Sequence, residues 1–438
     1  MPELRGETAW AEPGTHSYMN SRSDVKASDF PQIAKIASAL GEVTELLARE
    51  LALPTDEAPR WNEFEWRIAR AVAAMQGVSS LLAVRMRWKE PANWRRFLEA
   101  QRSHTLGRHL RIMELLDSID SKARRSGIAL VALKGVALHE RGIYKAGERP
   151  MADVDLLVRQ ADLNSMTMLL GECDYDLTFT TWRHRLFESR RHTSYTSDGL
   201  GEHIDNPIKI ELHTTVRERL PLSETDITSF LFPPDAPAGL NTYSSDVALM
   251  MHLLLHATGN MRAHAVRLIQ LHDIAQLAAR FGPGDWRDLL NARPNDRGLW
   301  WALPPLAMTS HYYPSTIPPM ILARLETECS WFLKRLSRRQ SLTDVSWSNI
   351  KVHAFPGIQW SRTPQEAVRF MFSRMWPSRD ARTEIQRFAA NEPGVSGVPW
   401  YGISQPERIV RWLFSRPPRV QTLLSVRAAL VQRYDESH

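Results

Sequence analysis

Apolar residues recur at helical spacing through the first quarter of the chain. They fall at steps of three and four over residues 33–47, again over 64–75, and more sparsely over 94–125. This spacing places apolar side chains on one stripe of a helix. It predicts a helical region over residues 29–127, preceded by an aperiodic polar arm over residues 1–28 that is expected to be disordered.

Short apolar runs of strand length replace the helical spacing after residue 127. The predicted strands and the helices between them are 127–133, 136–144 (helix), 151–158, 161–170 (helix) and 208–216. Strands mixed with short helices at this spacing favour a small module with a mixed β-sheet. We expect this module to cover residues 128–235 and to end in the Pro-rich stretch that begins at Phe232.

Helical spacing returns beyond Ser244. The predicted helices are 247–257, 266–281, 300–311 and 321–336, with Gly259-Asn260 expected to interrupt the first of these regions. We assign residues 236–345 to a C-terminal helical bundle and residues 346–438, where Pro and Trp recur, to an extension of short helices and irregular segments. The predicted fold class is α+β, a small mixed-sheet module between predominantly helical N- and C-terminal regions.

Composition narrows the class of protein. The chain has 438 residues, of which 43% are hydrophobic and only two are Cys, so neither a disordered chain nor a disulfide framework fits. No uninterrupted apolar run reaches the roughly 18 residues of a membrane span. Because the first 30 residues also lack the apolar core of a signal peptide, we expect a cytoplasmic protein without a membrane partner.

Charge is partitioned unevenly along the chain. The formal net charge is +6, yet residues 126–240 hold 12 basic and 17 acidic side chains. Residues 241–438 hold 24 basic and 15 acidic side chains, and residues 1–125 hold 19 and 17. The acidic excess therefore coincides with the predicted sheet module, which directs attention to its carboxylates.

Asp153 and Asp155 are the central candidates for chemistry. Alternate residues of a strand face the same side, so both carboxylates project together while Val154 and Leu156 face the other way. Two close carboxylates repel each other when ionised, and a divalent cation is the usual compensation. Oxygen ligands suit Mg²⁺ or Mn²⁺. Glu211, which alternates with apolar residues in the strand 208–216, offers a third carboxylate if that strand lies beside the first.

Cationic candidates precede the paired carboxylates. Lys134-Gly135 ends one predicted strand and opens a predicted helix, where a glycine allows a phosphate to approach the backbone closely. Lys134 and Arg149 add positive charge that suits a triphosphate. Each of these features alone is also compatible with an ordinary turn and solvated side chains.

Together these residues resemble a family of largely uncharacterised bacterial nucleotidyltransferases within the DNA polymerase β-like superfamily. The resemblance rests on Leu133-Lys134-Gly135, on the block RPMADVDLLV from Arg149 to Val158, and on Glu211-Leu212-His213. It implies a nucleotidyltransferase module that moves a nucleoside monophosphate from an NTP, most readily ATP, to an acceptor nucleophile by a two-metal mechanism, releasing pyrophosphate.

The resemblance also implies roles for individual residues. Asp153, Asp155 and Glu211 would be the catalytic metal ligands, with Glu211 nearest the acceptor, and Lys134, Gly135 and Arg149 would bind the nucleotide. The chain departs from the wider superfamily because Val136 follows Gly135, where a second Gly or a Ser is usual. Residues 136–152 also form a long gap before the paired carboxylates.

Three residues are further candidates for an acceptor pocket: His213, His256 and Asp273. The acceptor itself stays open between a small molecule, an RNA end and a protein or peptide. His252 and the His272-Asp273 pair also suggest a weaker alternative, a metal phosphohydrolase, but no H-E-x-x-H motif is present and we expect no zinc. A second alternative is a module that keeps the fold only to bind a nucleotide or partner.

Overall fold

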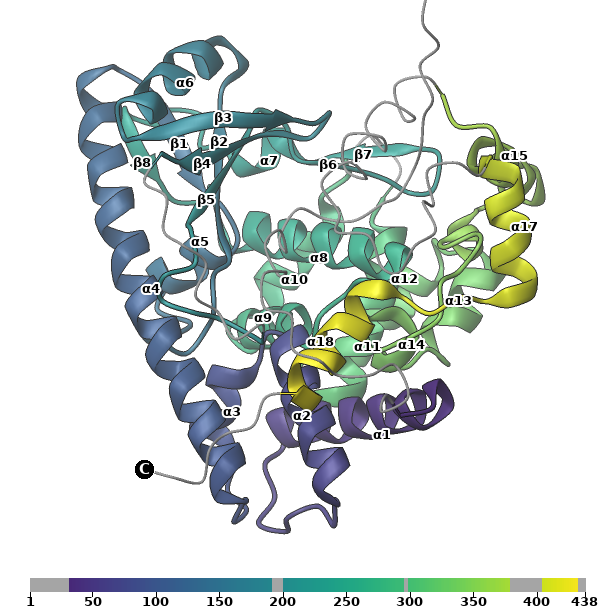
Figure 1. Cartoon of the computed structure of the whole chain (residues 1–438). Coiled ribbons are helices and arrows are strands. Elements are labelled where there is room, and N and C mark those ends of the chain that lie inside the picture. Colours follow the sequence, from purple (N-terminus) through teal and green to yellow (C-terminus); the bar gives the residue numbers. More distant parts are fainter. Residues whose placement is uncertain (1–30, 191–199, 295–297, 379–403, 432–438) are drawn as a thin grey trace, which may run out of the picture.

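The computed structural model describes residues 31–190, 200–294, 298–378 and 404–431. The arm predicted over residues 1–28 lies outside the described residues. Helices form both ends of the described chain and a mixed six-stranded sheet lies between them (Figure 1). The predicted α+β class, with a mixed sheet between helical regions, is therefore confirmed.

The sheet has the strand order β3-β4-β5-β2-β1-β8. Its strands are β1 (Ala129–Ala132), β2 (Asp153–Val158), β3 (Tyr175–Thr180), β4 (His184–Ser189), β5 (Lys209–His213) and β8 (Gly239–Asn241). β2 runs parallel to β5 and antiparallel to β1, β1 runs parallel to β8, and the β3-β4-β5 side is antiparallel. The strands β1, β2 and β5 match the predicted ones, whereas β3, β4 and β8 were not predicted.

Short elements connect the strands. They are α5 (Gly135–Glu140), α6 (Leu163–Gly171), α7 (Thr228–Leu231) and a separate hairpin of β6 (Arg217–Arg219) and β7 (Glu224–Asp226). α5 and α6 lie where the sequence predicted helices. One face of the sheet packs against α6 and the long helix α4 (Ala92–Arg125), and this core includes Val154, Leu156 and Leu212.

The helix α4 links the sheet to the N-terminal helices. These are α1 (Ile33–Ala52), α2 (Glu63–Met75) and α3 (Ser79–Arg85). At 34 residues α4 is about 50 Å long and runs along one side of the molecule (Figure 1). Its first half buries Trp94 and Phe97 with the N-terminal helices, and its second half buries Ile112 and Leu116 beneath the sheet. One rigid element therefore fixes the sheet relative to the helical core.

The helix α8 (Asp246–Ala263) crosses the centre of the molecule and is almost entirely buried (Figure 1). The side chain of Ser245 caps its start by accepting a hydrogen bond from the Ala248 N–H. The expected interruption at Gly259-Asn260 is wrong, because α8 runs through both residues. A Cβ at Gly259 would come within 2.7 Å of the Glu218 carboxylate, so the glycine permits close packing on β6.

Most of the remaining helices, all except α15 and α17, complete a large hydrophobic core with α1, α2 and α8. The remaining helices are α9 (Leu268–Ala278), α10 (Pro283–Asn291), α11 (Leu303–Tyr312), α12 (Pro319–Glu326), α13 (Trp331–Ser337), α14 (Leu342–Val345), α15 (Pro364–Met375), α17 (Gln405–Ser415) and α18 (Val420–Val431). The single helix predicted over 321–336 is in fact two, because Ser330 caps a new start by accepting from the Leu333 N–H.

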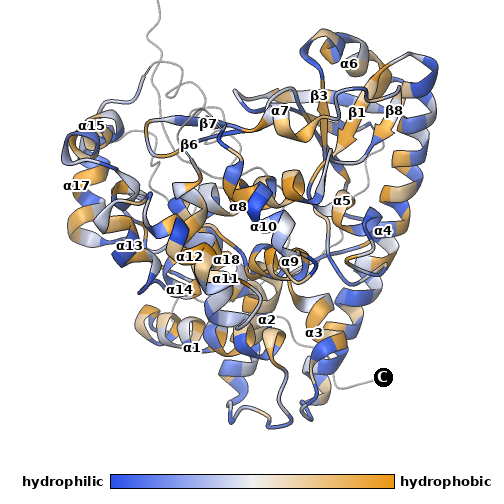
Figure 2. Ribbon diagram, turned by 180° about the vertical axis from the view of Figure 1, so that it is seen from behind, coloured by the Kyte–Doolittle hydropathy of each residue, from blue (hydrophilic) through white to orange (hydrophobic). Residues whose placement is uncertain are grey.

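The buried hydrophobic residues lie mainly in strands and on helix faces. In Figure 2 the central strands are mostly orange, consistent with the fully buried β1 segment Ala129–Ala132. Across the described residues, none of the helices combines the length and apolar character needed to span a bilayer.

Candidate functional site

The register of β2 and β5 aligns three carboxylates. The two strands are parallel neighbours, and Asp155 lies directly opposite Glu211. Asp153 shares the face of Asp155, because side chains two residues apart in a strand project to the same side. That face is turned away from α4, whose core takes up the alternating Val154 and Leu156. The strand adjacency on which the sequence prediction depended is therefore present.

Two histidines extend this carboxylate group across the sheet. His213 of β5 and His184 of β4 are opposite each other in the antiparallel pair. His213 Nε2 lies 3.0 Å from Asp155 Oδ1 and 3.6 Å from Glu211 Oε2. His184 Nδ1 lies 3.5 Å from the same Glu211 oxygen. Five potential metal ligands, counting Asp153, therefore lie on three adjacent strands.

His184 was missed by the sequence analysis. The strand HRLFES alternates between polar and apolar residues only weakly, and nothing in it resembles a known motif. The available signal was His184 itself, at the start of a short run that precedes the strand of His213. The pairing of β4 with β5 is a long-range contact, which the local pattern does not encode.

Lys134 approaches the carboxylates from the loop after β1. Its ammonium nitrogen donates to Asp155 Oδ1 at 3.1 Å, and its backbone N–H donates to the Tyr243 hydroxyl, also at 3.1 Å. The residue has a positive φ of 48°, which is uncommon for a lysine and points to a constrained position. The predicted Lys134-Gly135 turn therefore lies directly beside the paired carboxylates.

Arg149 is held by a buried carboxylate of α9. Its Nε and Nη2 donate to the two oxygens of Asp273 at 2.9 and 2.7 Å, and the Tyr144 hydroxyl donates to the same group at 2.8 Å. A Cβ on Gly135 would come within 2.5 Å of Arg149 Nη1, so a glycine is required for this approach. Asp273 thus acts on the site by orienting Arg149.

The carboxylates carry different proton affinities. Burial, with the nearby charges of Asp155 and Glu211, raises the pKa of Asp153 to about 7. Burial also acts to raise the pKa of Asp155, but the Lys134 ammonium and the hydrogen bond from His213 outweigh it and hold that pKa well below its usual range. One acid of the pair is therefore ionised and the other is poised near neutrality.

The histidines also differ in charge. Burial lowers the pKa of His184 to about 3, so its ring is neutral at pH 7. Burial acts in the same direction on His213, but the carboxylates of Asp155 and Glu211 raise its pKa above the usual value. Burial raises the pKa of Glu211. The Lys134 ammonium and the raised proton affinity of His213 thus offset part of the negative charge of Asp155 and Glu211.

The histidines of the phosphohydrolase alternative do not converge. His252 Nδ1 bonds the Tyr243 hydroxyl at 2.7 Å, and His272 Nδ1 bonds the Tyr313 hydroxyl at 3.0 Å. Asp273 is occupied by Arg149, as described above. These contacts give each side chain a separate packing role and leave no shared metal position.

One cavity of about 890 Å³ collects the residues that the sequence singled out. All nine candidates line it: Lys134, Gly135, Arg149, Asp153, Asp155, Glu211, His213, His256 and Asp273. Ten Lys and Arg side chains line the cavity against six Asp and Glu. The C-terminal helices add Arg374 of α15, Arg408 of α17 and Arg419, which precedes α18. Residues 126–240 contribute five cations and five acids to the lining, so the cavity joins a wall of mixed charge on the sheet to a cationic wall on the C-terminal helices.

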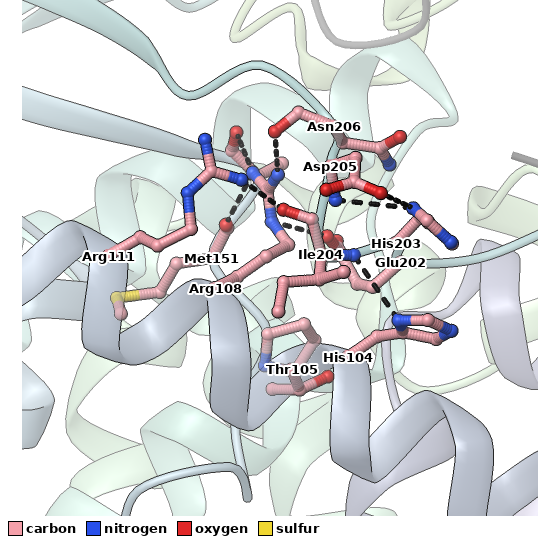
Figure 3. Close-up of polar contacts among 12 residues, drawn as sticks. His104, Thr105, Arg108, Arg111, Met151, Glu202, His203, Ile204, Asp205 and Asn206 are labelled. Carbon is pink, nitrogen blue, oxygen red and sulfur yellow. Dashed lines mark hydrogen bonds and ion pairs between the residues drawn. The ribbon is translucent and has the colours of Figure 1, made fainter. Parts of the chain in front are cut away.

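A buried arginine outside the carboxylate group sets the start of both strands. The Arg108 guanidinium donates to the carbonyls of Met151 and Ala152, just before β2, at 3.3 and 3.0 Å, and to that of Asn206, near the start of β5, at 2.5 Å (Figure 3). Its Nε pairs with a Glu202 carboxylate oxygen at 3.0 Å. Arg108 thus fixes β2 against β5 at the end where Asp153 lies.

The fold and the cavity together define the class of protein: paired carboxylates on a central strand line a cavity beside Lys and Arg side chains. A family model described as an uncharacterised nucleotidyltransferase matches residues 62–309, more than half of the chain, and the protein belongs to that family. No curated protein and no solved structure matches the chain.

Proposed function

We propose that this protein is a metal-dependent nucleotidyltransferase that moves a nucleoside monophosphate from an NTP to an acceptor nucleophile and releases pyrophosphate. The observation that carries the proposal is the register that sets Asp155 opposite Glu211, with Asp153 on the same cavity-facing side. The family match supports the same class of reaction.

The carboxylates suit divalent metal ions. Asp153, Asp155 and Glu211 offer oxygen donors of the kind that Mg²⁺ and Mn²⁺ bind. Without a cation, mutual repulsion and burial raise the pKa of Asp153 to about 7, so the group favours added positive charge. Bound ions would neutralise the phosphates and activate the attacking oxygen.

The chain's own residues bind and orient the nucleotide. Lys134 and Arg149 line the cavity close to the carboxylates, and we assign them to the triphosphate. Arg149 is oriented in advance by its two hydrogen bonds to Asp273, so little side-chain entropy remains to be lost on binding. Gly135 allows this guanidinium to lie against the backbone at the start of α5.

The reaction is a substitution at the α-phosphorus. The acceptor oxygen or nitrogen forms a bond to that phosphorus as the bond to the bridging oxygen of pyrophosphate breaks. We assign the acceptor's proton to a Glu211 carboxylate oxygen, because burial raises the pKa of this group and so makes it a better base. Pyrophosphate leaves beside Lys134 and Arg149.

The cationic wall favours an acceptor that carries negative charge. Arg374 and Arg419 face the cavity from the C-terminal helices, on the side opposite the carboxylates. Burial lowers the pKa of each to about 10, which shows how costly their charges are without an anion nearby. ATP as the nucleotide and a cytoplasmic location stay predictions from the sequence.

The test is transfer of label from the α-phosphate. Purified protein is incubated with each NTP labelled on the α-phosphate, Mg²⁺ or Mn²⁺, and a lysate as the acceptor pool. Label on the α-phosphate should enter an acceptor, and label on the γ-phosphate should not enter that same acceptor. Asp153→Asn and Asp155→Asn should each reduce transfer by more than about 100-fold, beyond the losses typical of outer-shell partners of a metal.

The matched control is Asp117→Asn, an exposed acid on α4. It should retain full transfer. Undiminished transfer in Asp155→Asn would remove the metal-ligand assignment. NTP binding without transfer to any acceptor pool would favour the non-catalytic alternative.

A further inference from the structure

His184, Glu211 and His213 form a compact group of metal-ligand atoms beside Asp155, called the His–Glu–His cluster below. Among the His, Cys, Asp and Glu side chains of the described residues, the ligand atoms of this cluster converge. They all lie within 4.8 Å of one another. Two neighbouring strands supply the group, and their register sets the histidines opposite each other. The sheet therefore holds the three side chains rigidly in place.

The separations in the cluster match the edges of a coordination shell. Glu211 Oε2 lies 3.5 Å from His184 Nδ1 and 3.6 Å from His213 Nε2. Ligand atoms about 2.1 Å from a shared ion are about 3.4 Å apart in a tetrahedral shell and about 3.0 Å apart in an octahedral one. Asp155 Oδ1 lies 3.0 Å from His213 Nε2 and is next to the same position.

The ring of His184 gives an independent indication of a ligand. Its Nδ1, the nitrogen on the side of the cluster, has only the 3.5 Å contact with Glu211 Oε2, and its Nε2 is buried without a hydrogen-bond partner in the described part of the chain. Buried polar groups are normally hydrogen-bonded, so a ring in this state calls for an explanation. Its neutral form is the one that binds metal ions.

The donor set selects a class of metal. Mg²⁺ and Mn²⁺ prefer oxygen ligands, whereas imidazole nitrogens suit Fe²⁺, Co²⁺, Cu²⁺ and Zn²⁺. Two histidines and one carboxylate form the ligand set of several catalytic transition-metal sites. We propose that the His–Glu–His cluster binds a divalent first-row transition ion, distinct in metal preference from a position formed by Asp153 and Asp155 alone.

This inference rests on the proposed function for the ion's role, because Glu211 belongs to both sites. The ion would lie on the Glu211 side of the cavity, where we assign the acceptor. Its binding can be measured without any nucleotide, so the two proposals fail separately. From the sequence we expected no zinc, because His184 was not recognised as a candidate there. The inference departs from that expectation.

The experiment uses the full chain freed of metal by a chelator and dialysis. Co²⁺ is titrated in the absence of nucleotide, and its visible absorption and calorimetric affinity are recorded, with Zn²⁺ and Mg²⁺ as competitors. We expect Zn²⁺ to displace Co²⁺ and Mg²⁺ to compete at least about 100-fold less well. Pulsed electron resonance of the Cu²⁺-loaded wild type should show coupling to imidazole nitrogen.

Variants separate the cluster from its surroundings. His184→Gln and His213→Asn should each weaken Co²⁺ binding at least tenfold, whereas Asp153→Asn should change it by less than about threefold. His311→Ala removes an exposed histidine on α11 and serves as the matched control. Near-UV circular dichroism verifies that each variant is folded.

The outcomes are distinguishable. Absence of nitrogen coupling in wild type, or Co²⁺ affinity unchanged in both histidine variants, would overturn the inference even if Mg²⁺-dependent transfer is observed. Co²⁺ binding that depends on His184 and His213 supports the inference even if no NTP is used, in which case only the proposed function fails.

Discussion

The guanidinium of Arg108 lies at the start of β2 and β5, where three backbone carbonyls accept its hydrogen bonds. Its side chain is only 3% exposed, and Glu202 is its ionic partner. Removing this group would leave those carbonyls without their donor and Glu202 without its counter-charge. The effect on stability should therefore exceed that of an ordinary surface ion pair.

We predict that Arg108→Leu lowers the free energy of unfolding by about 3 kcal/mol, the size expected when one partner of a buried pair is lost. Urea unfolding followed by circular dichroism measures the change. Arg111→Leu is the control one turn along α4, since the hydrogen bond that Arg111 donates in Figure 3 goes to a single backbone carbonyl, that of Ile204. It should cost less than about 1 kcal/mol. Equal losses in both variants would contradict the role of Arg108.

At this scale the sequence predicted residues that share one strand better than residues that meet across strands. Asp153 and Asp155 follow from alternation within a single run, and Glu211 follows from alternation in another. His184 and Arg108 depend on pairing between segments far apart in the chain. No local pattern carries that information, because the energy that selects the pairing comes from burial in the whole sheet.

The helix α18 (Val420–Val431) returns to the N-terminal region and packs against α2 (Glu63–Met75). Its Val426 and Ala429 are fully buried in the main core, and the Leu430 carbonyl accepts a hydrogen bond from Arg67 at 2.9 Å. The C-terminal helix thus covers a helix that is more than 340 residues away in sequence. Its packing should contribute to the stability of both ends.

We predict that Val426→Ala lowers the free energy of unfolding by about 2 kcal/mol, because it removes buried methyl groups and leaves a cavity. Hydrogen exchange should also speed up in α2, which α18 covers. Arg427→Ala changes the exposed neighbour on the same helix and should leave both measurements nearly unchanged. Faster exchange confined to α18 itself would show that the two helices are not coupled.

The helices with strong periodicity of apolar residues were predicted well, but the points at which helices end or continue were not. The helices α1, α2, α4 and α8 follow the spacing of apolar residues. The expected break at Gly259 fails because helix propensity is a weak term beside tertiary packing, and here the glycine fits against Glu218. The strand β3 was missed because it is largely exposed and lacks an apolar run.

Acid stability is a property of the whole molecule, because neutral histidines are buried in several parts of it. Burial lowers the pKa of His252 and His272 to about 3 and that of His264 to about 4. As the pH falls below the unfolded value near 6.5, the unfolded chain takes up protons that the native protein does not. Stability is therefore lost between about pH 6.5 and 3, with the share of His264 lost by about pH 4. Asp153 acts in the opposite direction, since its raised pKa lets the native state hold a proton.

We predict that His264→Asn reduces the pH dependence of the unfolding free energy between pH 4.5 and 6 by about 1.4 kcal/mol per pH unit, the contribution of one proton. His264 caps α8 in the left-handed conformation, with φ 57° and ψ 42°, which Asn tolerates. Urea unfolding at three pH values gives the slope. His311→Asn changes an exposed histidine and should keep the wild-type slope. An identical slope in His264→Asn would refute the assignment.

The basic excess of residues 241–438 reappears on one side of the cavity, where they contribute five arginines and one aspartate. The acidic segment 126–240 supplies the carboxylates of β2 and β5, and the basic segment 241–438 supplies the opposite wall. Arg374 lies on that wall, and burial together with the charge of Arg262 lowers its pKa to about 10. An anionic acceptor would relieve this cost, whereas the triphosphate is assigned to Lys134 and Arg149 on the sheet side.

We therefore predict that Arg374→Gln lowers label transfer to the acceptor about tenfold or more, the loss expected for one charge-assisted hydrogen bond. The affinity for ATP, measured by calorimetry without acceptor, should stay within about twofold of wild type. Arg369→Gln, an exposed position on the same helix α15, is the control and should alter neither quantity. If ATP affinity falls as far as transfer does, Arg374 binds the nucleotide instead. Because the attraction is electrostatic, raising the salt concentration should reduce transfer in wild type more steeply than in Arg374→Gln.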